Sequence, residues 1–327
     1  MSGLVTAVFA AERGEHLVDA PRSRRYDAFR RSFDEVAYRR DLAARGLAWV
    51  GRDDPAFPAR LRTIHDPPVG LFVRGAPPRL DHLPAIAIVG ARACSAYGSS
   101  VAHDLARGLA AAGAVVVSGL ARGVDACAHR GALETGMTLA VLGCGIDRDY
   151  PRAHAALAAQ VTEAGSIVSE YAPGVEPAPW RFPARNRIVA GLAQATLVVE
   201  ARERSGALIT ADFALDEGRE VLAVPGEITS ALSRGTNHLL RLGAVPVTCL
   251  GDALAVLGLE PAPSPDPLDP RLAPVQAVIA DAQVSADQIA RRTGLSAGAV
   301  AAALAELELA GLVVQSDGLY REVMRRS

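Results

Sequence analysis

Short, wholly apolar runs restrict the fold of this chain more than any other feature of its sequence. They recur across its middle at residues 86–89, 115–117, 139–142, 167–168, 197–199 and 221–224. The stretches between them, such as 98–112, 125–135, 152–164 and 210–217, are typical of helices. Continuous rather than alternating apolar residues characterise parallel strands that helices cover on both faces. The alternation therefore predicts a doubly wound, mostly parallel α/β sheet over residues 81–258.

The residues before this domain have a mixed character, and we expect 1–80 to form a lead-in that packs against it. Within the lead-in, residues 22–45 predict one charged amphipathic helix. Its expected apolar positions are Tyr26, Phe29, Phe33, Val36 and Tyr38. A short strand is expected at 71–73, ended by Gly75.

The residues after the domain predict a linker and a second, smaller domain. Residues 259–274 are rich in proline, which continues neither helix nor sheet and makes a semi-rigid spacer. Three short helical stretches and a terminal β-hairpin then predict a winged-helix domain over 275–327. Its third helix, 297–310, carries Glu306 and Glu308 rather than the Arg, Asn or Gln that read DNA bases. We therefore expect this small domain to contact a protein.

Composition narrows the classes of function. The net charge is −2, so any site for a polyanion must come from local clustering. All 34 basic residues are Arg, which excludes a lysine Schiff base and the lysine of a phosphate-binding P-loop. The four cysteines lack C-x-x-C spacing and predict free thiols in a reducing compartment. With no signal-peptide pattern and no apolar run of about 18 residues, the expected location is cytoplasmic, without membrane insertion.

The turns that follow the predicted strands carry the candidate site. In doubly wound sheets, ligands bind outside the carboxyl ends of the strands. Glycines there permit tight turns, and the arginines among them can reach an anion. These turn residues are Gly90, Arg92, Ser118, Gly119, Arg122, Gly123, Ser205 and Gly206. Because the charges are spread over several turns, the pattern favours a polyanion over a single small phosphate.

Residues 181–187 reinforce this edge. Three arginines, Asn186 and Phe182 stand at the start of a predicted helix, where unpaired N–H groups and the helix dipole already favour anions. Arg185 and Arg187 are expected to contact phosphate, and Phe182 could offer a stacking face for a base. The alternative interpretation is that Phe182 lies in the core and the arginines pair with carboxylates.

Familiar catalytic and cofactor motifs are incomplete. Gly143 and Gly145 are followed by Arg148 where a dinucleotide-binding motif needs its third glycine. The sequence has no H-E-x-x-H or G-x-S-x-G motif, and its seven histidines lack metal-ligand spacing. These patterns predict a protein without cofactor, metal or catalytic machinery.

The domain nevertheless resembles a known family. Its marks are residues 88–92, 97–98, 118–119, 122–125, 140–143, 147, 150–151, 169–170, 182–192, 198–201, 205–206, 210–211, 224–226 and 235–237. By these motifs the chain is similar to the DprA (Smf) DNA-processing proteins. The resemblance implies an extended Rossmann-type domain that binds single-stranded DNA and dimerises, and a non-enzymatic role in natural transformation, loading the RecA recombinase on incoming DNA. The family's pocket motifs fall on Gly90, Arg92, Ser118, Gly119, Phe182, Arg185, Asn186 and Arg187.

Two departures and two alternatives remain. Ala91 stands where the family usually has Ser or Thr, and the first 45 residues show no clear sign of the small helical domain that often begins its members. A nucleotide-processing Rossmann enzyme, phosphoribohydrolase-like and using Glu170 or Glu200, is the alternative function, although its P-G-G-x-G-T motif is missing. A winged-helix transcription factor with a ligand-sensing domain is a third interpretation.

Overall fold

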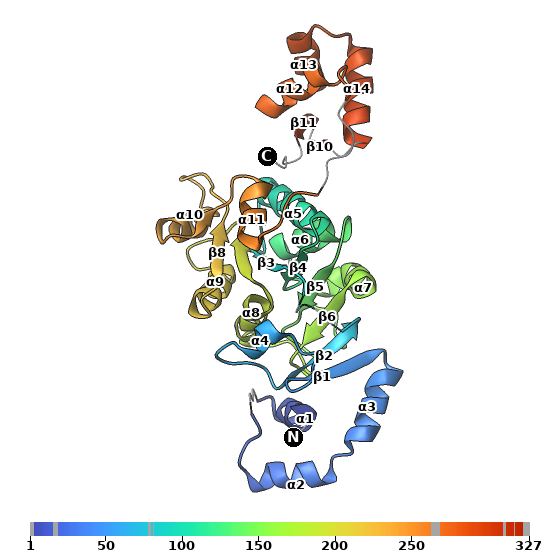
Figure 1. Cartoon of the computed structure of the whole chain (residues 1–327), viewed down its shortest axis with the longest axis vertical. Coiled ribbons are helices and arrows are strands. Elements are labelled where there is room, and N and C mark those ends of the chain that lie inside the picture. The colour runs from blue at the N-terminus through green and yellow to red at the C-terminus, as the bar shows by residue number, and fades with distance from the viewer. Residues whose placement is uncertain are drawn as a thin grey trace. The chain divides into compact units, whose positions relative to one another are not determined.

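The computed structural model describes residues 3–15, 19–77, 80, 82–262, 269–309, 312–316 and 318–322. The chain divides into two compact units (Figure 1). The first comprises Met1–Thr248 with Asp252–Glu260, and the second comprises Cys249–Gly251 with Pro261–Ser327.

A nine-stranded sheet organises the first unit, in the order β1-β2-β6-β5-β4-β3-β7-β8-β9 (Figure 1). The strands are β1 Leu47–Gly51, β2 Gly70–Gly75, β3 Ala85–Val89, β4 Val115–Ser118, β5 Thr138–Val141, β6 Ser166–Ser169, β7 Ala195–Val198, β8 Glu220–Ala223 and β9 Val245–Pro246. Strands β3 to β9 pair in parallel, whereas β1 and β2 are antiparallel additions at one edge. The strand order reverses at β3, between β4 and β7, which is where such sheets form a ligand crevice. The predicted fold class is confirmed.

Helices cover both faces of this sheet. They are α4 Ala59–Arg62, α5 Ala96–Ala111, α6 Val124–Leu133, α7 Ala155–Ala164, α8 Arg181–Leu192, α9 Gly206–Asp216, α10 Arg234–Arg241 and α11 Leu250–Leu257. Successive residues of one strand join different cores: Val141 packs with α8 and α9, whereas Ala140 packs with α6 and α7. Burial on both faces is the physical reason that these strands are apolar at every position.

The sheet begins earlier in the chain than the sequence predicts. Residues 47–75, expected within the lead-in, supply β1 and β2, and β2 pairs with β6. Trp49 lies directly opposite Phe72, with ring centroids 4.6 Å apart. Such cross-strand aromatic pairs stabilise antiparallel strands. The predicted strand at 71–73 is the centre of β2, and β1 was not anticipated.

The first helices differ from the single helix predicted over 22–45. Residues 3–44 form α1 Gly3–Arg13, α2 Arg24–Ser32 and α3 Glu35–Ala44. Asp34 breaks the predicted helix because its carboxylate accepts a hydrogen bond of 2.9 Å from the Ala37 amide and caps α3. A row of contacting rings joins α1 to α3, in the order Tyr26, Phe9, Phe29, Phe33 and Tyr38. Val36 was expected to be one of the buried apolar positions of the predicted helix, but its side chain is 69% exposed.

The second unit contains three helices and a hairpin, the winged-helix arrangement that was predicted. These are α12 Ala273–Asp281, α13 Ala286–Thr293, α14 Ala297–Leu309, β10 Val313–Ser316 and β11 Leu319–Glu322. Ser285 and Gln288 form a capping box at the start of α13, and Gly294 ends it in a left-handed conformation. Residues 263–268 of the predicted linker lie outside the described residues. Within the described ranges, no helix combines the length and apolarity needed to cross a membrane.

Candidate functional site

The turns after β3, β4 and β7 contact one another at the point where the strand order reverses. The Val124 amide donates a hydrogen bond of 3.2 Å to the Ala91 carbonyl, and the Ala91 amide donates one of 2.7 Å to the Glu200 carbonyl. Gly123 has a φ of +74°, and a Cβ at this position would overlap the Ala91 carbonyl oxygen. Glycine is therefore required there both by conformation and by close approach. The packing holds Arg92 and Arg122 on adjoining turns.

The arginines on these turns divide into exposed and buried groups. Arg92, Arg122, Arg202 and Arg204 are exposed. None of these four forms an ion pair with another described residue. Guanidinium groups left without a carboxylate can bind phosphate, so these four supply the accessible positive charge of the edge.

Arg185 lies beneath the edge and is only 4% exposed. Its guanidinium donates to the carbonyl oxygens of Gly119, at 2.9 Å, and Val141. A Cβ at Gly119 would overlap this guanidinium, so the glycine makes room for it. Burial lowers the pKa of Arg185, while the nearby Asp125 carboxylate raises it. Arg185 thus joins the ends of β4 and β5 and is not accessible to a phosphate.

Asp125 completes this support from the start of α6. Its carboxylate accepts hydrogen bonds from the amides of Gly119, at 3.1 Å, and Ala121, at 3.3 Å. Burial raises the pKa of Asp125, and Arg185 opposes that shift. Between the two amides, Leu120 adopts a φ of +56°, which is uncommon for a side chain of its type. The carboxylate therefore fixes the unusual turn that carries Arg122.

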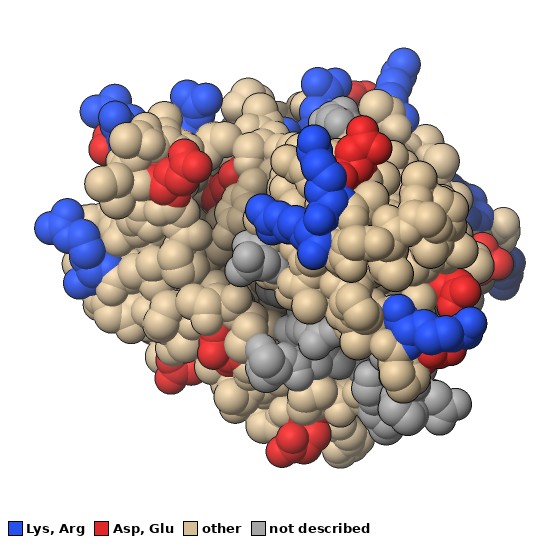
Figure 2. Space-filling view, turned by 90° about the horizontal axis from the view of Figure 1, so that it is seen from above, with Lys and Arg blue, Asp and Glu red and all other residues tan. Residues whose placement is uncertain are grey.

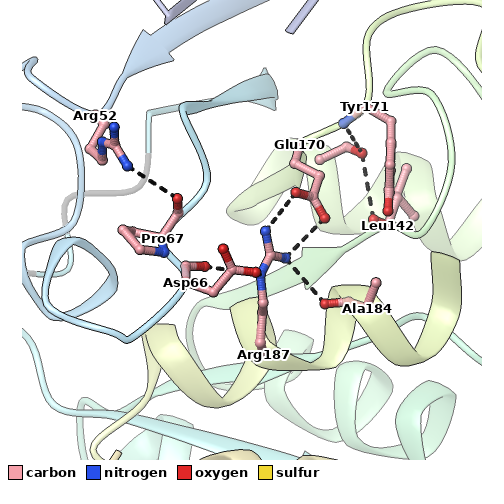
Figure 3. A network of polar contacts seen from close by, with 9 residues as sticks. Arg52, Asp66, Pro67, Leu142, Glu170, Tyr171, Ala184 and Arg187 are labelled. Atoms are coloured by element: carbon pink, nitrogen blue, oxygen red, sulfur yellow. Dashed lines mark hydrogen bonds and ion pairs between the residues drawn. The ribbon is translucent and has the colours of Figure 1, made fainter. Parts of the chain in front are cut away.

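Arg187 is also buried, at 5% exposed, and Figure 3 shows its contacts. It forms two hydrogen bonds with the Glu170 carboxylate, at 3.0 and 2.8 Å, and its Nε donates to the carbonyl and carboxylate of Asp66. Burial lowers the pKa of Arg187, but the Glu170 and Asp66 carboxylates raise it, and the net pKa is raised. Arg187 therefore ties α8 to the end of β6 and to the β1–β2 connection. For Arg187 the alternative interpretation of the sequence, in which the arginines pair with carboxylates, therefore applies.

Ser118 and Arg181, two other residues expected to face a ligand, instead contact groups inside the protein. The Ser118 hydroxyl is fully buried and donates a hydrogen bond of 2.6 Å to the Ile88 carbonyl. Arg181 is buried, donates to the Glu176 carbonyl and lies over the rings of Tyr171 and Trp180. Each of the three arginines of 181–187 thus finds carbonyl, carboxylate or aromatic partners inside the protein, which favours the alternative interpretation over direct contact with phosphate.

Phe182 lies at the surface of the edge between several groups. The Tyr150 ring stacks with it, with centroids 5.1 Å apart and an angle of 29°, and the Arg92 guanidinium lies 5.6 Å from its centroid. A Cβ at Gly143 would approach the Phe182 ring to 2.9 Å. Tyr150 follows the third predicted strand and belongs to the same edge, although it was not among the predicted site residues. Tyr150, Phe182 and Arg92 are called the stacking cluster below.

Asn186, Ser205 and Gly206 connect α8 to α9. The Asn186 side-chain amide donates a hydrogen bond of 3.0 Å to the Gly206 carbonyl. The Ser205 hydroxyl accepts one of 3.3 Å from the Ala207 amide and caps α9. Asn186 and Ser205 are half-buried, Gly206 is exposed, and all three remain next to the solvent side of the edge.

Glu200 occupies the position at the start of α5 where a Rossmann-type domain would receive a nucleotide phosphate. Its carboxylate accepts hydrogen bonds from the Ser95 amide, at 2.9 Å, and the Ser95 hydroxyl, at 2.5 Å. A Cβ at Gly98 would overlap this carboxylate. The protein's own anion therefore fills the site. Because Glu170 is likewise paired with Arg187, both carboxylates that a nucleotide-processing enzyme was expected to use are engaged.

The fold and its edge define a class: a Rossmann-type α/β protein whose sheet ends in exposed arginines and an aromatic stack, followed by a winged-helix unit. The chain belongs to the family of DNA recombination-mediator protein A, whose model matches residues 48–258. A model of the DprA winged helix domain matches residues 259–318. The resemblance to DprA and Smf proteins found in the sequence is confirmed.

Individual proteins of this family are similar to the chain in sequence and in structure. A putative DNA processing protein DprA from Mycobacterium tuberculosis is 41% identical over 319 residues, covering 89% of this chain and 81% of the relative. The X-ray structure of DprA from Streptococcus pneumoniae matches with a TM-score of 0.67 and 36% identity, over 78% of this chain and 92% of that one. A structure of DNA processing protein A from Helicobacter pylori, described for its single-stranded DNA binding mode, matches with a TM-score of 0.58 and 32% identity, over 62% and 92%.

Proposed function

We propose that this protein binds single-stranded DNA along the carboxyl edge of its sheet. The observation that carries the proposal is the placement of Arg92 and Arg122, exposed and without ion pairs among the described residues, beside the aromatic rings of the stacking cluster. Arginines that bind the backbone and rings that stack on bases are the two components of single-strand sites. The single-stranded DNA binding of the Helicobacter pylori relative supports the same ligand.

The proposal divides the expected site residues into two roles. Exposed and half-buried residues line the path of the strand: Gly90, Arg92, Arg122, Gly123, Phe182, Asn186, Ser205 and Gly206. Buried residues shape the turns beneath it: Ser118, Gly119, Arg185 and Arg187. This division differs from the sequence-based expectation, in which Arg185 and Arg187 contact phosphate directly.

We further propose that the protein holds DNA without reacting with it. The alternative enzymatic function needs a carboxylate free to act on a nucleotide. Glu200 accepts hydrogen bonds from Ser95, and Glu170 is paired with Arg187, so neither is positioned to serve. Such engagement supports a binding protein.

The wider role rests on the family resemblance. It includes natural transformation and recombination, protection of incoming DNA, loading of RecA, dimerisation through the Rossmann-type domain, and a cytoplasmic location. For the winged-helix domain we propose a protein partner, because Glu306 and Glu308 are exposed on α14. Acidic side chains at these positions would repel a DNA backbone.

The proposed site can be tested by the salt dependence of binding. Affinity for a fluorescent oligonucleotide is measured for Arg92→Gln/Arg122→Gln over a range of salt concentrations. Each lost phosphate contact lowers the slope of log K against log salt by about 0.7 for single strands, so we expect weaker binding and a slope smaller by about 1.4. Arg130→Gln, which changes an exposed arginine on α6 away from the edge, should bind as wild type does. A double variant with wild-type affinity and slope would refute the site.

A further inference from the structure

We infer that Tyr150 is the ring on which an unpaired base stacks, and that Phe182 and Arg92 support it. The inference rests on the proposed function, since it assumes that a single strand follows this edge. It assigns a binding role to Tyr150, which stands among the residues that mark the family resemblance but not among the predicted site residues.

The faces of Phe182 already have neighbours. Tyr150 stacks with the ring at 5.1 Å, the Arg92 guanidinium lies 5.6 Å from its centroid, and Gly143 leaves room for its edge. A base that stacked on Phe182 would compete with one of these groups for the ring. Phe182 is also only half-exposed, as expected for a residue that positions another.

Tyr150 is more exposed to solvent than Phe182. Its side chain is 41% exposed, and Phe182 is the one described ring that it contacts. Within the described residues its hydroxyl forms no hydrogen bond, so no contact of the hydroxyl holds the ring. A ring supported on one side and open to solvent elsewhere can accept a base at little cost in conformational entropy.

Arg92 adds a positive charge beside the Phe182 ring, on which Tyr150 stacks. It contacts the same Phe182 ring, is exposed and has no ion pair with a described residue. One nucleotide can therefore place its base on Tyr150 and its phosphate near Arg92. In a duplex both faces of each base are covered by neighbouring pairs, so this arrangement selects unpaired bases.

The test compares three variants of the full chain: Tyr150→Leu, Tyr150→Phe and, as a matched control, Tyr97→Leu. Tyr97 is an exposed tyrosine on the same edge that lies outside the stacking cluster. Affinity is measured for an oligonucleotide with normal bases and for one of equal length with abasic positions. Thermal melting of each variant checks its folding.

Base stacking of the usual strength predicts that Tyr150→Leu weakens binding of the normal strand by about tenfold. Binding of the abasic strand should change little, and Tyr150→Phe and Tyr97→Leu should retain wild-type affinity for both. Stacking on Phe182 predicts the reverse, because removing Tyr150 would free a face of that ring and leave binding unchanged or stronger. That outcome would overturn the inference.

Failure of the inference can be told from failure of the proposed function. If wild type binds neither strand, the proposed function is wrong. If wild type binds the normal strand and Tyr150→Leu binds it equally well, only the role of Tyr150 is wrong. An equal loss of affinity for normal and abasic strands would also contradict stacking, because it would point to a change in phosphate contacts.

Discussion

The arginines at the carboxyl edge of the sheet have different roles, depending on whether they are buried or exposed. Arg185 and Arg122 belong to the same edge, but Arg185 is buried against two carbonyl oxygens whereas Arg122 is exposed. A buried charge must be compensated by its partners, and removing it leaves them unsatisfied. Residue type therefore did not determine role at this edge; burial did.

Arg185→Met should lower the free energy of unfolding by about 3 kcal/mol or more, because Asp125 and the Gly119 carbonyl would lose their buried partner. Urea denaturation measures the change. Arg122→Met, at an exposed position of the same edge, should change stability by less than about 0.5 kcal/mol. Equal effects of the two substitutions would show that Arg185 is not a structural support.

His129 gives a pH dependence that can be assigned to one group. It is fully buried, its Nδ1 lies 2.7 Å from the Thr138 hydroxyl, and burial lowers its pKa from 6.5 to about 3. Between these values the unfolded chain binds a proton that the folded chain does not. Stability from this group is thus complete above pH 6.5 and is lost as the pH falls toward 3, by up to about 1.4 kcal/mol per pH unit.

Unfolding of His129→Gln from pH 7 to pH 4 should therefore show a shallower loss of stability than wild type, after correction for its lower starting value. His238→Gln, at an exposed position, should keep the wild-type slope. A His129→Gln slope equal to that of wild type would mean that other groups control the acid sensitivity.

Among the elements, the turns after β3 and β4 depend on a shared glycine contact. Gly123→Ala should push the turn of Ala91 away, since its Cβ would overlap the Ala91 carbonyl and its φ of +74° is unfavourable. Gly113→Ala is the matched control, because Gly113 also has a positive φ, of +89°, but has open space around it. We expect Gly113→Ala to cost about 1 kcal/mol in backbone strain alone. Gly123→Ala should cost more and also weaken DNA binding, measured by urea denaturation and anisotropy; equal effects would contradict the packing argument.

The sequence predicted elements well where a single local pattern determines them. Strands β3 to β8 are short apolar runs between helical stretches, and their positions were anticipated. Strand β1 was missed because Trp49 becomes recognisable as a strand residue only opposite Phe72, which follows it by 23 residues. The partners of Arg187 could not be read locally either, because Asp66 lies 121 residues before it in the chain. The same holds for Tyr150, whose role depends on a ring in another turn.

The molecule as a whole combines a near-neutral charge with one local site. On the face shown in Figure 2, arginines are interspersed with acidic side chains among a majority of uncharged residues. The net charge of −2 fits this mixed surface and gives no general attraction to DNA. Binding is therefore expected to depend on particular arginines.

Arg291→Gln/Arg292→Gln tests this dependence in the full chain, because both arginines are exposed on α13 of the second unit. We expect wild-type affinity for a single strand, since the proposed site lies wholly in the first unit. A loss comparable to that of Arg92→Gln/Arg122→Gln, in the same anisotropy assay, would assign strand binding to the winged helix as well.

The most direct measurement is a salt titration of wild-type affinity for a single strand and for a duplex of the same sequence. Because bases must be unpaired to stack on the edge, we predict tighter binding of the single strand at every salt concentration, with a difference that persists at high salt where phosphate contacts are screened. Equal affinity for both, or a preference for the duplex, would contradict the assignment of this edge to single-stranded DNA.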